Sequence, residues 1–282
     1  MPRLLIAGCG YVGQATADLF HGAGWEVEGW TASAESAAKL SDKPYPVIAV
    51  DIAQRDQVNA RPENFDAVIH CASTRGGDVD LYRRVYLDGA RNLLDRFVGS
   101  TILFTSSTSV YGQKSGEWVT EESETVPARD TGQILLEAER LILGSGGIVT
   151  RLAGIYGPGR SALLQKFLKG QAAVDPPHDR YVNQVHRDDI ASALLHLLNR
   201  QTSAGEIYNV VDNEPILQSE CYRWLAGKLN RPLPPRARST SAPKRGASNK
   251  RVSNAKLRAT GWTPKYPSFA EGMEKSILPS WA

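Results

Sequence analysis

The first half of the chain alternates short apolar runs with longer segments in which apolar residues recur at helical spacing. Residues 12–23, 78–97 and 131–143 show the helical spacing, and the apolar runs rich in β-branched residues are 3–7, 26–30, 47–50, 67–71, 101–105 and 148–152. Short buried strands joined by helices are typical of a parallel sheet covered by crossover helices. Because such crossovers are right-handed, the pattern predicts an α/β fold with a Rossmann-type doubly wound parallel sheet.

The regularity ends after Leu152, where Gly154, Gly157, Pro158 and Gly159 indicate a loop. Beyond it, helical and strand-like patterns alternate less evenly. We therefore expect a Rossmann domain of residues 1–152, to which the segment 183–212 returns. The remaining residues, 153–182 and 213–282, are expected to form a smaller substrate-binding lobe.

Composition narrows the class of protein. Of the 282 residues, 41% are hydrophobic and 22% charged, as in ordinary globular proteins. No apolar run approaches the roughly 18 residues that a membrane helix needs. The three cysteines, Cys9, Cys71 and Cys221, have no disulfide-framework or metal-site spacing. We expect a cytoplasmic protein with neither a membrane segment nor a bound metal.

Charge is distributed unevenly along the chain. Between Glu220 and Glu271 there are twelve basic residues and no acidic one, whereas the rest carries 21 basic and 30 acidic residues. Such a stretch indicates either a solvated loop or a surface that binds a small anionic ligand. Few aromatic residues lie between its basic residues, which argues against nucleic acid as the partner.

A glycine motif follows the first strand and opens the first helix. It reads Gly8, Cys9, Gly10, Tyr11, Val12, Gly13. The first glycine permits a tight turn, the second lets backbone N–H groups approach a pyrophosphate, and the third allows close packing of helix on strand. The motif therefore predicts a dinucleotide site for NAD or NADP, with Gly8, Gly10, Tyr11, Val12 and Gly13 along the phosphates.

The second strand ends in residues that bear on the choice of cofactor. No carboxylate is present there to accept a bond from the ribose 2′-hydroxyl, and no basic residue to meet a 2′-phosphate. The hydroxyls of Thr31 and Ser33 can bind a phosphate, or they can cap the next helix. On the first interpretation the sequence favours NADP slightly over NAD.

Several further segments occur in the order found in one family. They are Asp51-Ile52, His70-Cys71-Ala72, residues 104–112, 151–159, 185–189, 205–209 and 253–258. With the glycine motif, they make the chain resemble the extended short-chain dehydrogenase/reductases, the NAD-dependent epimerase/dehydratase group, over nearly its whole length. The resemblance implies that Asp51 and Ile52 contact the adenine and that Ala72 and Ser73 lie along the middle of the cofactor. It also implies that Ser107 polarises the substrate.

The acid/base pair of that family is missing. Its tyrosine and lysine positions are Thr131 and Leu135 here, and its usual asparagine is Tyr86. A threonine hydroxyl has too high a pKa to act as an acid near neutral pH, and leucine carries no charge. The chain thus resembles an atypical subgroup without the Tyr–Lys pair.

Substitute acids are few. Tyr86, Tyr111 and Tyr156 are the candidates, although the last two are usually structural in the family. His70 and His186 are interpreted as core or loop histidines.

Two functions remain open on this basis. The first is an oxidoreductase or isomerase of the epimerase/dehydratase type, acting by a non-standard mechanism on a sugar nucleotide or another small carbonyl or hydroxyl compound. The second is a non-catalytic NAD(P)-binding sensor or interaction protein. The resemblance also implies a homodimer formed through helices near residues 78–98 and 131–143.

Overall fold

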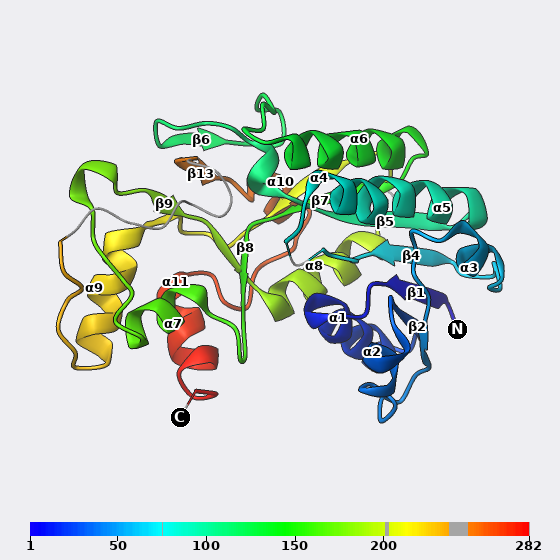
Figure 1. Cartoon of the computed structure of the whole chain (residues 1–282), viewed down its shortest axis with the longest axis horizontal. Helices are drawn as coiled ribbons and strands as arrows, with labels where there is room; N and C mark the ends of the chain where they lie inside the picture. The colour runs from blue at the N-terminus through cyan, green and yellow to red at the C-terminus, as the bar shows by residue number, and fades with distance from the viewer. Residues whose placement is uncertain (75, 201–202, 237–247, 282) are drawn as a thin grey trace. The chain divides into compact units, whose positions relative to one another are not determined.

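Seven strands form one central sheet in the computed structural model, which describes residues 1–74, 76–200, 203–236 and 248–281 (Figure 1). Their order is β11-β7-β5-β4-β1-β2-β3, and the pairs β1–β2, β2–β3, β1–β4 and β4–β5 are parallel. The strands are β1 (Arg3–Ala7), β2 (Glu26–Thr31), β3 (Val47–Ala49), β4 (Ala67–His70), β5 (Thr101–Ser107), β7 (Ile148–Leu152) and β11 (Ile207–Val210). The strand order reverses at β1, and in doubly wound sheets ligands bind outside the carboxyl ends of the strands at such a point. This confirms the predicted α/β, doubly wound fold.

Helices enclose the sheet, so its inner strands are buried on both faces and read as continuous apolar runs. They are α1 (Tyr11–Gly22), α2 (Ala34–Ala38), α3 (Arg55–Asn59), α4 (Val79–Tyr82), α5 (Gly89–Arg96), α6 (Asp130–Gly144) and α8 (Arg187–Leu198). In α6 the buried residues Ile134, Leu135, Ala138 and Ile142 follow helical spacing. Figure 1 shows α4, α5 and α6 side by side.

The helix expected over residues 78–97 is one continuous helical segment with an irregular middle. Between α4 and α5 lies η1 (Arg83–Asp88), which has the wider winding of a π-helix. Periodicity alone does not reveal this stretch, because six residues are too few to show a change of period. Stretches of this kind are frequent near functional sites.

Backbone packing divides the described chain into two compact units. The first comprises residues 1–110, 127–151 and 190–208, and the second 111–126, 152–189 and 209–282. The sequence-based boundary at residue 152, with its return segment 183–212, stays a prediction about domains. None of the helices in the described residues is long and apolar enough to cross a membrane.

The second unit has its own apolar core and three small two-stranded sheets. Its helices are α7 (Ala162–Leu168), α9 (Gln218–Lys228), α10 (Ala255–Ala259), α11 (Phe269–Gly272) and η5 (Met273–Ile277). The sheets pair β8 (Gly154–Tyr156) with β10 (Gln184–His186), β9 (Tyr181–Val182) with β12 (Ile216–Leu217), and β6 (Glu117–Val119) with β13 (Lys250–Val252). Phe167, Tyr222, Leu225, Phe269 and Met273 lie in the core. Strands of two or three residues carry no period that sequence analysis can detect.

Candidate functional site

The glycine turn follows β1, and at two of its three glycines the packing of the protein leaves no space for a side chain. Gly8 has φ +112°, and a Cβ built there would lie 2.2 Å from the backbone nitrogen of Ala72. A Cβ on Gly13 would lie 2.2 Å from the carbonyl oxygen of Gly8. Both positions therefore require glycine whether or not a ligand binds. The structure also brings Ala72, predicted to lie along the cofactor, directly against Gly8.

Gly10 differs from its neighbours. A Cβ built on Gly10 would meet nothing within 4 Å, so the protein leaves the space beside it open. Gly10 is the N-cap of α1, no side chain caps that end, and the first turn contains no acidic residue. An uncapped helix N-terminus with open space beside it suits an anion, since the helix dipole and backbone N–H groups favour negative charge there. Tyr11 and Val12 are the first two residues of this helix.

At the end of β2, the predicted hydroxyls take part in a helix cap. The Ser33 hydroxyl is the N-cap of α2 and accepts a bond from the Ser36 backbone nitrogen at 3.2 Å, while the Thr31 hydroxyl donates to the Ser33 carbonyl at 3.1 Å. The structure thus shows the capping arrangement that the sequence left open. Binding of a 2′-phosphate by these residues, and with it the preference for NADP, stays a prediction.

The loop after β3 holds the two residues assigned to the adenine. The Asp51 carboxylate accepts a bond from the Ala53 nitrogen at 3.0 Å and lies 3.8 Å from the Arg84 guanidinium. Ile52 is buried, and its carbonyl accepts a bond from Asn92 at 2.9 Å. These bonds fix the loop in place. The adenine contact itself stays a prediction, as does that of Ser73 after β4.

Ser107 is the last residue of β5, and its hydroxyl accepts a bond from the Ser109 nitrogen at 3.2 Å. The preceding residue, Ser106, belongs to a buried polar group that sequence analysis missed. Its hydroxyl donates to Glu139 of α6, which pairs with Arg151 of β7 at 2.7 Å. The two charged side chains are only 2% and 4% exposed. The only sequence signal for this group was a charged residue within an otherwise apolar helix face and another within an apolar strand.

The two positions that the resemblance assigns to the acid/base pair lie in α6. Thr131 is the second residue of α6 and half-buried, and Leu135 is 4% exposed on the buried face of the same helix. A buried leucine carries no charge, so Leu135 cannot do what a lysine does at this position in the family. That the chain lacks the usual acid/base pair stays a prediction.

The candidate acid Tyr86 lies in the interior. It belongs to η1 and stacks on His70, with ring centroids 6.3 Å apart and an interplanar angle of 24°. Its ring also meets Phe104 at 6.2 Å. Burial lowers the pKa of His70 to about 4, so this imidazole is neutral near pH 7. Its interpretation as a core histidine agrees with this position.

In the second unit, the remaining candidate acids are also buried. The Tyr111 hydroxyl donates to Asn209 at 2.9 Å. Burial raises the pKa of the Tyr156 hydroxyl far above its usual value, which makes it a poor acid near neutral pH. His186 is fully buried, its ring centroid lies 3.9 Å from that of Tyr266, and burial lowers its pKa to about 4. These environments are those of structural residues.

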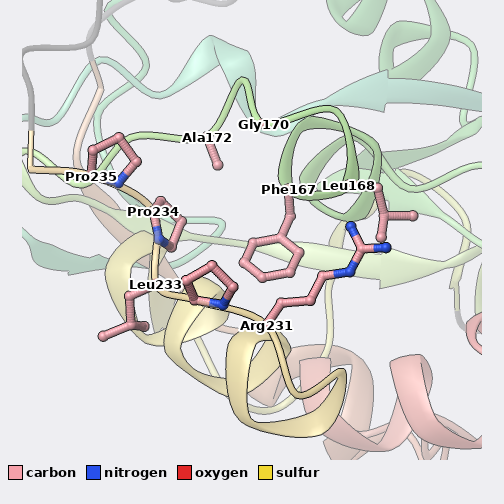
Figure 2. A pocket seen from close by; sticks show the side chains of 9 residues that line it. Phe167, Leu168, Gly170, Ala172, Arg231, Leu233, Pro234 and Pro235 are labelled. Carbon is pink, nitrogen blue, oxygen red and sulfur yellow. The ribbon is translucent and has the colours of Figure 1, made fainter.

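The second unit also contains a shallow pocket of about 250 Å³ (Figure 2). Its walls are apolar, and none of the predicted cofactor or catalytic residues lines it. The lining residues are Phe167, Leu168, Gly170, Ala172, Arg231, Pro232, Leu233, Pro234 and Pro235. Within the part of the chain that the structure describes, no cluster of three or more His, Cys, Asp or Glu side chains is arranged to hold a metal ion.

Comparison with known proteins agrees with this geometry. The profile of the NAD dependent epimerase/dehydratase family matches residues 4–210. Protein YeeZ of Escherichia coli (strain K12) is 31% identical over 221 residues, which cover 74% of this chain and 77% of that protein. The solved structure of an NAD-dependent epimerase/dehydratase from Methylobacillus flagellatus is 28% identical, covers 99% of this chain and 98% of its own, and gives a TM-score of 0.80.

A more distant structure shares the fold. MoeE5 in complex with UDP-glucuronic acid and NAD is 18% identical, covers 100% of this chain and 99% of its own, and superimposes with a TM-score of 0.83. The profile match spans most of the chain and includes the glycine turn, Asp51, Ala72 and Ser107. The predicted family is thereby confirmed, and with it the nicotinamide dinucleotide as the cofactor class of that family. The chain belongs to the NAD-dependent epimerase/dehydratase family.

Proposed function

We propose that this protein binds NAD or NADP at the glycine turn and acts on a sugar nucleotide as an epimerase/dehydratase-like enzyme without the usual acid/base pair. The observation that carries the proposal is the open space at Gly10 beside the uncapped N-terminus of α1. Packing explains the other two glycines but not this one. A sugar-nucleotide substrate is supported by the fold shared with MoeE5, which was crystallised with UDP-glucuronic acid and NAD.

A bound nicotinamide supplies hydride transfer to and from the substrate. In this chain, the backbone at Gly10 would hold the pyrophosphate, and Asp51 and Ile52 the adenosine. The Ser107 hydroxyl, at the carboxyl end of β5, would donate a hydrogen bond to the reacting substrate oxygen. Thr131 and Leu135 contribute neither an acid nor a cation, so proton transfer would have to involve the substrate, solvent or a residue outside the family positions.

The cofactor site can be tested with two glycines of the same helix. Gly10→Ala places a methyl group where the pyrophosphate is proposed to bind, whereas Gly22→Ala, at the other end of α1, also meets nothing within 4 Å. We expect Gly10→Ala to weaken NAD or NADP binding at least tenfold, because the phosphates lose close approach to the backbone. Gly22→Ala should bind as the wild type does.

Calorimetric titration with NAD, NADH, NADP and NADPH measures both variants and also decides which cofactor is preferred. The thermal unfolding midpoint should be similar in Gly10→Ala and the wild type. Equal affinities in the two variants, or no binding of any of the four forms by the wild type, would rule out this site.

The catalytic proposal rests on Ser107. Ser107→Ala should lower turnover by about 10²-fold, since the hydrogen bond to the reacting oxygen strengthens as charge develops. Cofactor affinity should stay unchanged. The measurement is cofactor absorbance during reaction with a panel of UDP- and dTDP-sugars and simple carbonyl compounds. Ser109→Ala, two residues further on, is the control, and turnover indifferent to Ser107→Ala would contradict the mechanism.

A second function is favoured by the buried, uncharged Leu135 in place of a catalytic lysine. In this second proposal the protein is a non-catalytic sensor or interaction protein, which binds NAD(P) and reports the redox state of the cofactor to a partner. Cofactor binding without any hydride transfer, together with a partner captured only with one redox form, would favour this role. Capture that does not depend on the cofactor would count against it.

A further inference from the structure

Two helix ends and a proline-rich segment of the second unit form the wall of the pocket in Figure 2. The first helix end is that of α7, whose last turn contributes Phe167 and Leu168 to the wall. Beyond it, Gly170 has φ +66°, and the Gln171 nitrogen donates to the Lys166 carbonyl at 2.9 Å. This bond closes the helix and fixes the backbone that follows it.

The second helix end is that of α9, and it is closed in the same way. Asn230 has φ +49°, a conformation that asparagine tolerates, and the Arg231 nitrogen donates to the Ala226 carbonyl at 3.0 Å. Three of the four residues at 232–235 are prolines, whose rings restrict the backbone. The wall is therefore ordered before any ligand arrives, which lowers the entropic cost of binding.

The pocket has one charged residue in its lining, Arg231. Among the described residues, no carboxylate pairs with this side chain and no hydrogen bond to its guanidinium is present. No acidic residue occurs at 160–174 or at 221–236, the two stretches of sequence that contain the lining residues. The pocket thus combines apolar walls with one uncompensated positive charge.

The size and layout of the pocket limit what can fill it. Its volume is about 250 Å³, whereas an apolar cavity of about 150 Å³ holds benzene. Figure 2 shows the Arg231 guanidinium at one end of the lining residues, Pro234 and Pro235 at the other, and the Phe167 ring between them. There is space for one aromatic ring on a short chain.

The charge of the ligand follows from the lining. A guanidinium binds a carboxylate through two parallel hydrogen bonds, and one cation matches one carboxylate. Flat apolar bodies pack well on aromatic rings such as that of Phe167. A polyphosphate would lack further cations to bind, because the other lining residues are uncharged.

We propose that this pocket binds a small aryl-substituted carboxylic acid, with its ring against Phe167 and the prolines and its carboxylate on Arg231. The inference goes beyond the proposed function, since none of the cofactor or substrate residues named there lines the pocket. Arg231 belongs to the basic stretch between Glu220 and Glu271, for which the sequence left a small anionic ligand as one of two interpretations. Three other basic residues of that stretch, Arg238, Lys244 and Arg245, lie outside the described residues.

The experiment titrates the full-length protein by calorimetry with 3-phenylpropanoate. Two further probes separate the parts of this ligand. The amide 3-phenylpropanamide keeps the ring without the charge, and acetate keeps the charge without the ring. We expect both to bind more weakly than 3-phenylpropanoate by about tenfold or more, because each lacks one of the two contacts.

Arg231→Met keeps an unbranched side chain but removes the charge. It should weaken binding of 3-phenylpropanoate by about tenfold or more and leave binding of the amide unchanged, since only the acid pairs with the guanidinium. Arg231→Lys keeps the charge without the planar fork and should show a smaller loss. Arg223→Met is the matched control, because Arg223 is an exposed arginine of α9 outside the pocket lining, and it should bind as the wild type does.

Several outcomes would overturn the proposal. They are no binding of 3-phenylpropanoate by the wild type, equal affinity for the acid and the amide, and an equal loss in Arg223→Met. Unchanged affinity in Arg231→Met with a lower thermal unfolding midpoint would show that Arg231 only offsets the partial negative charge of the two helix ends. A dimer that excludes the ligand would show that a second copy of the chain fills the pocket instead.

These outcomes are independent of the proposed function. The glycine turn belongs to the first unit and the pocket to the second, so the affinity for NAD or NADP should be the same in all of these variants. If 3-phenylpropanoate binding depends on Arg231 while no nicotinamide cofactor binds, the pocket stands and the proposed function fails. If the cofactor binds and 3-phenylpropanoate does not, only the pocket proposal is wrong.

Discussion

Gly8, Gly10 and Gly13 show that one residue type can occupy a motif for different physical reasons. Gly8 and Gly13 are required by the backbone, since a Cβ at either would collide with main-chain atoms. Gly10 has space around it, so packing does not require glycine there, and the pyrophosphate site proposed above would account for it. The motif as a pattern treats the three glycines alike, whereas the structure shows that packing requires glycine at Gly8 and Gly13 but not at Gly10.

His70 leads to a prediction about stability and pH. It is fully buried against the rings of Tyr86 and Phe104, and burial lowers its pKa from 6.5 to about 4. Below pH 6.5 the unfolded chain binds a proton that the folded protein does not. The folded state therefore loses stability as pH falls from 6.5 towards 4, by up to about 1.4 kcal/mol per pH unit from this group.

His70→Phe keeps an aromatic ring but removes the titration. The free energy of unfolding, measured by urea denaturation between pH 4 and pH 7, should decline less steeply with acid in this variant than in the wild type. His186, whose pKa burial also lowers to about 4, contributes equally to both proteins. Parallel pH profiles for the two proteins would show that His70 is not the group responsible.

At the scale of elements, α6 combines an apolar face with one buried charge. Leu135 and Ala138 pack against the interior, while Glu139 pairs with Arg151 of β7 and accepts a bond from Ser106 of β5. The pair links a helix to two strands at once. Because both charges are buried, each depends on the other to offset its desolvation.

Removing one partner of the buried Glu139–Arg151 pair should therefore lower the free energy of unfolding far more than breaking an exposed ion pair does. Glu139→Leu should destabilise the protein by about 3–5 kcal/mol, because Arg151 is left buried and unpaired. The double variant with Arg151→Leu should recover part of that loss. Chemical denaturation measures all three proteins. Glu137, also in α6, forms an exposed ion pair with Arg83, and Glu137→Ala should lower the free energy of unfolding by less than about 1 kcal/mol. An equally small loss of stability in Glu139→Leu would contradict the role of the buried pair.

At the scale of the whole molecule, the sequence predicted the first unit far better than the second. The strands at residues 3–7 and 148–152 have the predicted bounds, and the main helices differ by a residue or two. In the second unit, the pairs β6–β13 and β9–β12 were not predicted. Long periodic elements can be recognised locally, but strands of two or three residues exist only because a distant segment pairs with them. The homodimer through helices near 78–98 and 131–143 stays a prediction.

The sequence by itself determined the doubly wound fold and the family, and it predicts that Thr131 and Leu135 stand at the positions of the usual Tyr–Lys pair. Each follows from local periodicity or from residue identity at a motif position. Only the tertiary structure decided that Ser33 caps a helix, that Tyr86 and Tyr156 are buried, and that the Arg251 guanidinium lies near the rings of Trp118 and Tyr181. Burial and charge pairing depend on contacts between residues far apart in the chain. Arg251 and Trp118 are 133 positions apart, and no local pattern connects them.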